Sequence, residues 1–440
     1  MSESKKLTEP TLGKVLPVQI TTMLISVTAM FIDSLIIGKF LKDDALAAYG
    51  LTNPITLFIT AFGGMISNGV QVLAGESAGA GDKERLDRIF STSMIIGLAG
   101  SLIVLLGTFI FSRPLAVLLG ANSDTLVDLT SDYLKGIAFC FPMIVLVLVI
   151  PTFMQLNGTR KHLVVSAFLL IIIDAVFDIL NVKVFHGGML GMALASTFSY
   201  LISSVYLFWG FFRKKDYHFK LTFFKNDIVK GIFHFGLLYL TYKLCQVFLS
   251  LAINKILSKF GGKDFIAANS IISSINLMTG SFPSGFGSTT TIISSFFFGK
   301  KEKQGFRVFV KKVIWLSVII DVVIALAAII LAPQLTNAFN PESAKVYELA
   351  VFGLRLFSVS IVFNTVSYII KNSSQSVKNV KRAYAICILN DLALPLGFAF
   401  IVLAVKGISW IWLCYTIGQL IAMVISLLLI WREKEGWYGK

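Results

Sequence analysis

Long apolar stretches alternate with short polar breaks along the whole chain. Each stretch approaches the roughly 20 residues that a helix needs to cross a bilayer, and it is apolar on all sides rather than alternating like a membrane β-strand. The pattern predicts twelve spans, near residues 15–38, 46–74, 87–111, 130–155, 162–182, 189–212, 229–257, 266–297, 308–332, 347–370, 381–404 and 407–431. We therefore expect an all-α polytopic membrane protein.

The two halves of the chain repeat each other. The segment "GKFLKDDALAAYGLTNPI" beginning at Gly38 aligns without gaps with "SKFGGKDFIAANSIISSI" beginning at Ser258, an offset of 220 residues. Each half then holds six spans, and an even number places both copies in the membrane in the same sense. The repeat predicts two parallel six-helix lobes, residues 1–212 and 228–440, joined by a cytoplasmic linker at 213–227, an organisation typical of secondary transporters.

Composition agrees with a membrane protein. Hydrophobic residues make up 56% of the chain and charged residues 14%, whereas globular domains carry about 25% charged residues. The net charge of +15 does not indicate nucleic-acid binding, because Lys and Arg collect in the loops after even-numbered spans, such as "TRKH" and "KKEKQGFR". This bias predicts a multi-pass protein of the cell inner (plasma) membrane with both termini in the cytoplasm.

The sequence lacks both a nucleotide-binding motif and a cysteine motif. The sequence contains no G-x-x-x-x-G-K-[ST] phosphate loop, so we expect no ATP hydrolysis and no cofactor other than a coupling ion. The four cysteines all fall within apolar stretches and form no metal or disulfide motif, which predicts buried free thiols; they are Cys140, Cys245, Cys387 and Cys414.

Three aspartates lie inside predicted spans. Asp33 is in the first, and Asp174 and Asp178 are in the fifth, where a spacing of four places them on one helical face that Asn181 continues. An aspartate at the bilayer centre costs about 2.5–3.5 kcal/mol and is a functional candidate. Carboxylates so close resist joint ionisation, so we predict a site for H⁺ or Na⁺, with Asp33 and Asp178 as Na⁺ ligands. Alternatively, each aspartate caps a kink or pairs with a buried base.

The second half carries a different set of charges. Ile253 occupies the position equivalent to Asp33, while Lys243, Arg355 and Asp391 lie within predicted spans, with Lys243 and Arg355 on the buried side. We hypothesise a Lys243–Asp391 ion pair, with separate solvated roles as the alternative.

Polar and flexible side chains within the spans are candidates for a substrate cavity. Amides and hydroxyls could hydrogen-bond a substrate, and methionines suit a pliable wall, although the same residues serve equally to bridge helices or fill the membrane interior. The candidates are Asn53, Gln71, Gln155, Tyr200, Met30, Met65, Asn276 and Met278.

Several segments resemble the multidrug and toxic compound extrusion (MATE) family, and within it the prokaryotic DinF-like branch. They are "FIDSLIIGKF", "GESAGAGDKERL" and "DAVFDILNVKVFHGGMLGMALASTFS". The resemblance implies a V-shaped pair of helix bundles that exchange organic compounds for H⁺ or Na⁺. It places Asp33, Asp174, Asp178 and Ser196 at a first-lobe cation site. Asp174 stands where Asn is usual and Ser196 where Thr is usual, so proton coupling is at least as favoured as strict Na⁺ geometry.

The leading functional prediction is a secondary active antiporter that exports drug-like, amphipathic compounds by alternating access. We expect it to work as a monomer in the lipid bilayer, without nucleic acid or ATP. A flippase for lipid-linked precursors, with a related two-lobe architecture, is the alternative: Lys243 and Arg355 favour it, and the aspartates do not. An intramembrane enzyme is less favoured because no histidine lies at a span centre, and paired lobes with carboxylates on one side do not suit a symmetric channel.

Overall fold

The computed structural model describes residues 11–213, 217–339, 341 and 343–432. At positions 26, 30, 31, 34, 35, 38, 42, 43, 46, 47 and 432 only the backbone is described. Both ends of the chain, on which the predicted orientation partly depends, and residues 214–216 of the predicted linker lie outside the described residues.

Contacts divide the chain into two compact units, Met1–Leu237 and Leu238–Lys440. The first holds α1 (Leu12–Ala80), α2 (Lys83–Ile110), α3 (Ser112–Leu118), α4 (Asp124–Ala138), α5 (Phe141–Leu156), α6 (Lys161–Leu180), the π-helix η1 (Asn181–Phe185), α7 (Gly188–Phe212) and the 3₁₀ turn η2 (Leu221–Phe223). Helix α8 (Asn226–Phe260) passes from the first unit into the second.

The second unit continues with an equally helical series. Its elements are α9 (Lys263–Thr279), α10 (Ser281–Gly299), α11 (Lys303–Ile330), α12 (Ala332–Asn337), α13 (Ala344–Ser358), α14 (Ser360–Ser376), α15 (Val380–Ile388), the π-helix η3 (Leu389–Ala393), α16 (Leu394–Lys406), the 3₁₀ turn η4 (Ile408–Trp410) and α17 (Leu413–Arg432). The prediction of an all-α fold is confirmed.

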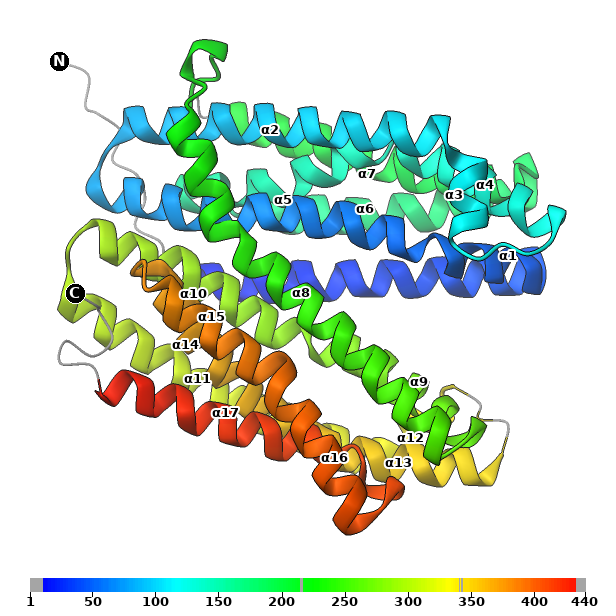
Figure 1. Ribbon diagram of the computed structural model, residues 1–440. Helices are drawn as coiled ribbons and strands as arrows, with labels where there is room; N and C mark the ends of the chain where they lie inside the picture. Colours follow the sequence, from blue (N-terminus) through cyan, green and yellow to red (C-terminus); the bar gives the residue numbers. More distant parts are fainter. Residues whose placement is uncertain (1–10, 214–216, 340, 342, 433–440) are drawn as a thin grey trace. The chain divides into compact units, whose positions relative to one another are not determined.

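The number of candidate membrane spans also agrees with the number predicted from the sequence. Eleven helical stretches of the described chain are long and apolar enough to cross a membrane, or twelve when the bent pair α4 and α5 counts as one span. Helix α1 alone carries two of them, Leu12–Ala29 and Ala48–Ala80, seen as dark-blue and lighter-blue arms in Figure 1. The prediction of a twelve-span multi-pass membrane protein is therefore confirmed.

Glycines set the packing where α8 begins. A Cβ at Gly69 of α1 would collide with the carbonyl of Ile232, and a Cβ at Gly236 would collide with the carbonyl of Met65. The two backbones approach each other this closely only because both positions lack a side chain. This contact explains why the first unit extends to Leu237, beyond the end of the predicted linker.

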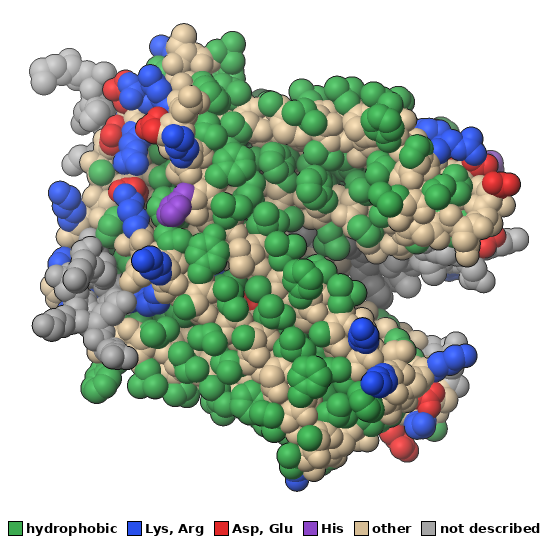
Figure 2. Space-filling model, viewed as in Figure 1, with side chains coloured by type: hydrophobic (Ala, Val, Ile, Leu, Met, Phe, Trp, Pro, Cys, Tyr) green, Lys and Arg blue, Asp and Glu red, His purple; other side chains and the backbone are tan. Residues whose placement is uncertain are grey.

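The helix surfaces are strongly apolar. On the face shown in Figure 2, hydrophobic side chains cover the middle of the helices and charged side chains gather near the helix ends. Ile103 of α2 is 72% exposed and Trp315 of α11 is 71% exposed. Soluble monomers rarely expose apolar patches of more than a few hundred Å², whereas lipid requires such a surface, so these side chains suit the hydrocarbon interior of a bilayer.

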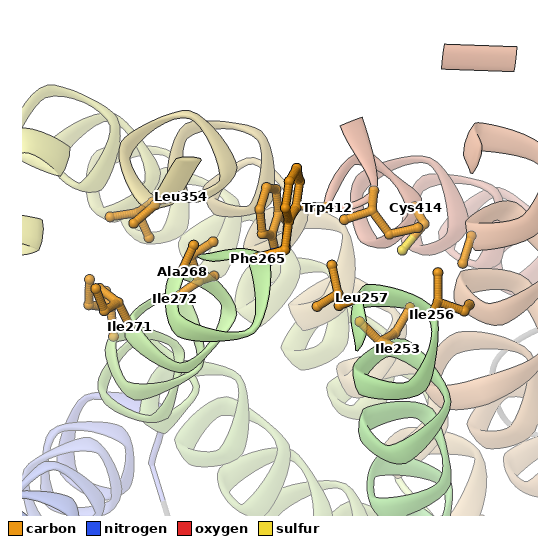
Figure 3. Close-up of a cluster of buried hydrophobic side chains, with 14 of the residues drawn as sticks. Ile253, Ile256, Leu257, Phe265, Ala268, Ile271, Ile272, Leu354, Trp412 and Cys414 are labelled. Atoms are coloured by element: carbon orange, nitrogen blue, oxygen red, sulfur yellow. The ribbon is translucent and has the colours of Figure 1, made fainter. Parts of the chain in front are cut away.

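The second unit has an apolar core built around Trp412 (Figure 3). Its indole stacks on Phe265, with ring centroids 6.0 Å apart and an interplanar angle of 9°. The indole Nε1–H donates to Asn269 Oδ1 at 3.0 Å, and Asn269 Nδ2 donates to Asn254 Oδ1 at 2.9 Å. Around them pack Ile253, Ile256, Leu257, Ala268, Ile271, Ile272, Leu354 and Cys414. The buried indole N–H thus has the partner that burial demands.

All four cysteines are buried and free. The prediction of core thiols without disulfides is confirmed.

Candidate functional site

Three aspartates from two helices meet inside the first unit. Asp33 comes from α1, and Asp174 and Asp178 occupy successive turns of α6, which packs against α1. Their exposed fractions are 9%, 3% and 0%. One carboxylate oxygen from each lies within 4.8 Å of the other two. The structure thus brings together the three carboxylates that the sequence singled out.

This cluster has no counter-cation among the described residues. Among the described residues, neither oxygen of Asp178 nor Oδ1 of Asp33 has a hydrogen-bond donor. None of the ion pairs in that part of the chain includes an aspartate of the cluster. Removing one carboxylate from water costs several kcal/mol unless a positive charge or hydrogen bonds compensate it. The alternative that each aspartate pairs with its own buried base finds no support here.

The spacing of the cluster suits a small hard cation or shared protons. Oxygen ligands of a hard ion such as Ca²⁺ lie about 2.3–2.6 Å from it, so two ligands on opposite sides are roughly 4.6–5.2 Å apart. Na⁺ has a similar radius, and the 4.8 Å limit of the cluster is compatible with this span. Asp33, Asp174 and Asp178 are the residues that would hold such an ion.

Helix α7 contributes hydroxyls beside Asp174. The Ser199 hydroxyl lies 3.1 Å from Asp174 Oδ1 and 2.8 Å from the Ser196 carbonyl oxygen, so its single proton can be donated to either. The Ser196 hydroxyl is also within hydrogen-bonding reach of Asp174. Ser196, which the family resemblance suggested, therefore does adjoin the cluster.

Aromatic residues lie around the carboxylates. Tyr49 and Tyr200 are both within electrostatic range of Asp33. Tyr49 packs edge-on against Tyr133 with ring centroids 5.3 Å apart. Tyr200, predicted from the sequence as a cavity residue, thus lies near the acidic cluster.

Asn181 is engaged elsewhere. Its Nδ2 donates to the Gly188 carbonyl at 3.0 Å, and its Oδ1 accepts from the Gly187 N–H at 3.1 Å. The side chain therefore holds the turn between η1 and α7, and a Cβ at Gly191 would collide with it. Both functional groups of the amide are occupied by backbone, so the structure gives Asn181 a positioning role in the turn.

The predicted cavity residues divide by burial. Met65, Gln71 and Gln155 are buried, and the side-chain oxygens of both glutamines lack a donor among the described residues. Asn53, Asn276 and Met278 are exposed, and the side chain of Met30 lies outside the described residues. Asn276 also borders a cavity of about 10 Å³, the space of one water. A role for these residues in substrate binding stays a prediction.

The second unit contains a buried ion pair that differs from the hypothesised one. Lys371 Nζ of α14 lies 3.9 Å from Asp391 Oδ2 in η3, and each side chain is 5% exposed. The ammonium also lies 3.4 Å from the ring centroid of Tyr368 and 4.5 Å from that of Tyr242. The hypothesised Lys243–Asp391 pair is therefore wrong: Lys371 takes the carboxylate, and Lys243 remains only within its electrostatic range.

The second unit also contains the charged residues Arg355 and Asp321. Arg355, interpreted as a buried-side cation, is exposed in the last turn of α13, where the helix dipole favours a positive charge. Asp321 in α11 is fully buried, and neither of its oxygens has a donor in the described chain.

Sequence reasoning overlooked Lys371. It opens the polar run "KNSSQS" at 371–376. This run resembles the start of a loop and lies just beyond the predicted span 347–370. In the structure this run is buried and helical, and the hydroxyls of Ser373 and Ser374 are satisfied by donating to the carbonyls four residues earlier. Ser199 could have been found from its position three residues after Ser196.

A family comparison matches this architecture. The MatE family model matches residues 19–180 and again residues 241–401. The chain belongs to the MatE family. The double match falls once in each unit, so it also supports the internal duplication.

Relatives cover nearly the whole chain. The multidrug export protein MepA of Staphylococcus aureus (strain N315) is 24% identical over 427 residues, which cover 96% of this chain and 92% of that protein. MepA of Staphylococcus saprophyticus is 24% identical over 416 residues, covering 92% of this chain and 90% of that protein.

Solved structures share the fold. A MOP superfamily transporter from Pyrococcus furiosus superposes with a TM-score of 0.87 at 20% identity, covering 95% of this chain and 94% of that one. A MATE transporter in complex with MaL6 superposes with a TM-score of 0.88 at 20% identity and the same coverage. The family resemblance predicted from the sequence and the predicted fold class are confirmed.

Proposed function

We propose that the chain is a secondary active exporter that moves organic, amphipathic compounds out of the cell in exchange for H⁺ or Na⁺. Membership of the MatE family and similarity to multidrug export proteins support export. The single observation that carries ion coupling is the buried cluster of Asp33, Asp174 and Asp178 without a counter-cation among the described residues.

The charge of the cluster favours protons as at least part of the coupling. Three ionised carboxylates carry three negative charges, and one Na⁺ supplies only one positive charge. Uptake of H⁺, alone or together with Na⁺, completes the neutralisation that a low-dielectric site requires.

The free energy available is adequate for a conformational switch. Each aspartate at membrane depth costs about 2.5–3.5 kcal/mol when uncompensated. Neutralising two of them matches the about 5.5 kcal/mol that takes a two-state equilibrium from 1:99 to 99:1. Alternating access then needs only that ion and substrate prefer different states.

The basic loops support an inner-membrane location with both termini in the cytoplasm. In this proposal the protein acts as a monomer, with no ATP and no cofactor other than the coupling ion.

The test is substrate accumulation in proteoliposomes with a pH gradient and a Na⁺ gradient imposed separately. We expect at least one gradient to drive accumulation by the wild type, and D33N and D178N to lose at least about 90% of it, since neutral amides cannot change charge. The matched control is D128N, which removes an exposed carboxylate paired with Arg113 at 2.7 Å.

Accumulation by the wild type that ignores both gradients would contradict antiport. Normal gradient-driven accumulation by D33N and D178N would be consistent with antiport but would show that the acidic cluster does not couple the ion to transport.

A flippase for lipid-linked precursors is the second candidate. The observation that favours it is the excess of positive charge in the second unit, where Lys371 and Lys243 face the single carboxylate of Asp391. Translocation of a phosphate-bearing lipid in the same proteoliposomes, without any imposed gradient, would favour this function over export.

A further inference from the structure

Lys243 occupies the centre of a membrane-spanning helix. It lies seventeen residues from either end of α8 (Asn226–Phe260), which is long and apolar enough to cross a membrane. At a rise of about 1.5 Å per residue, the nearest helix end is roughly 25 Å away. The side chain is only partly exposed, so its ammonium lies at the depth where lipid offers no counter-charge.

No carboxylate neutralises this lysine. Among the described residues, no carboxylate oxygen lies within 4.0 Å of Lys243 Nζ. The nearest electrostatic partner is Asp391, and that carboxylate is already paired with Lys371. Two lysines share one aspartate, so this region lacks one negative charge.

Two aromatic rings of the same helix lie near the ammonium. Lys243 Nζ lies 5.2 Å from the ring centroid of Tyr242 and 5.8 Å from that of Tyr239. Tyr242 in turn packs edge-on against Tyr368, with ring centroids 5.1 Å apart. Tyrosine faces attract a cation but carry no net charge, so they leave the deficit in place. Tyr242 and Tyr368 are buried, whereas Tyr239 is half-buried and leaves part of its ring open.

We propose that Lys243 is the binding site for a carboxylate carried by an aromatic, amphipathic substrate. The carboxylate supplies the missing negative charge, and the half-buried ring of Tyr239 receives the aromatic body. This inference rests on the proposed function, since it names the substrate class of the exporter. It places recognition of the anionic group in the second unit, while the acidic cluster lies in the first.

The test compares two dyes that differ in one group. Rhodamine B carries a free carboxylate, and its ethyl ester masks that carboxylate on the same fluorescent skeleton. Equilibrium binding of each is measured by fluorescence anisotropy on the full chain in phosphatidylcholine nanodiscs. The variants are K243Q and K243R, and K255Q is the matched control, because Lys255 is an exposed lysine of the same helix.

We expect the wild type to bind the acid at least about tenfold more tightly than the ester, as a charge-assisted contact implies. K243Q should lose the preference and bind both dyes with about equal affinity, whereas K243R and K255Q should keep the preference for the acid. Retained binding of the ester shows that K243Q is folded.

Several results would overturn the proposal. They are no preference or no binding in the wild type, a preference that survives K243Q, and an equal loss of both dyes in K243Q, which would make Lys243 structural. Adding phosphatidylglycerol distinguishes the source of the anion: if this lipid abolishes the preference, the site belongs to a lipid phosphate. Binding uses no gradient, so a failure of antiport in proteoliposomes would leave this result unaffected.

Discussion

The two units handle buried charge in opposite ways. In the first, Asp33, Asp174 and Asp178 share one site with no cation beside them in the described chain. In the second, Asp391 has its own lysine, Lys371, at 3.9 Å. In this account, the carboxylates of the first unit are neutralised by a mobile ion, and the carboxylate of Asp391 is neutralised by a lysine of the chain.

This contrast follows from how the duplicated halves have diverged. Ile253 occupies the position equivalent to Asp33, so the second unit has lost the residue that completes the acidic cluster. There, Asp391 is paired with Lys371, a counter-ion that is part of the protein chain. Such a counter-ion cannot leave, whereas the acidic cluster of the first unit has no fixed cation beside it in the described chain.

The largest expected effect comes from breaking the fixed pair. K371A leaves the buried Asp391 without its ion-pair partner, with only the Asn390 amide at 2.9 Å and Lys243 beyond ion-pair distance, and we expect it to lower the free energy of unfolding by about 3–5 kcal/mol. The measurement is equilibrium unfolding by SDS in mixed micelles. In the double variant K371A/D391A most of this loss should be recovered.

The matched control for this prediction is an exposed pair of the same unit. Lys345 Nζ lies 2.8 Å from Asp264 Oδ2 with a 64% exposed side chain, so K345A should cost no more than about 1 kcal/mol. Equal losses in the free energy of unfolding for K371A and K345A would mean that the buried pair stabilises the protein no more than the exposed pair does.

A smaller effect of opposite sign is expected in the first unit. D178N removes a buried charge without a donor, and we expect it to raise the free energy of unfolding by about 1 kcal/mol while gradient-driven accumulation falls. The same SDS titration measures the stability. A loss of stability comparable to that of K371A would erase the distinction between the units.

The smallest effect concerns the hydroxyl beside the cluster. S199A removes a donor 3.1 Å from Asp174 Oδ1, and we expect the free energy of unfolding to fall by about 0.5 kcal/mol. S93A is the control, since Ser93 is equally buried and donates to the Phe90 carbonyl within its own helix. A larger loss in S93A than in S199A would show that the hydroxyl does not support the carboxylate.

The helices and the pairing of Asp174 with Asp178 could be predicted from the sequence because both depend on local spacing. Apolar stretches of span length give the helices, and an interval of four residues places Asp174 and Asp178 on one face. Asp33 was identifiable because it is a single charge within an apolar stretch. Spacing does not reveal that Asp33 meets Asp174 and Asp178, because that depends on how α1 packs against α6.

The ion pair of the second unit could not be predicted in this way. Residues equally distant from a helix–helix turn usually meet, but Lys371 lies seven residues before Lys378 in the turn and Asp391 lies thirteen residues after it. The π-helix η3, which carries Asp391, changes the helical register there. The partner of Asp391 therefore depends on the rotation of α15 and η3 against α14, which spacing does not reveal.

The most direct test is whether ion and substrate binding are linked through the first unit. The affinity for rhodamine B is measured in nanodiscs as pH and Na⁺ concentration are varied, for the wild type, for D33N/D174N/D178N, and for D321N, which changes a buried carboxyl of the second unit.

We expect H⁺ or Na⁺ to change the wild-type affinity by roughly 5- to 150-fold, the usual range of coupling between sites. That dependence should vanish in the triple variant and persist in D321N. An affinity that ignores both ions in the wild type, or a dependence that survives loss of all three aspartates, would contradict the account.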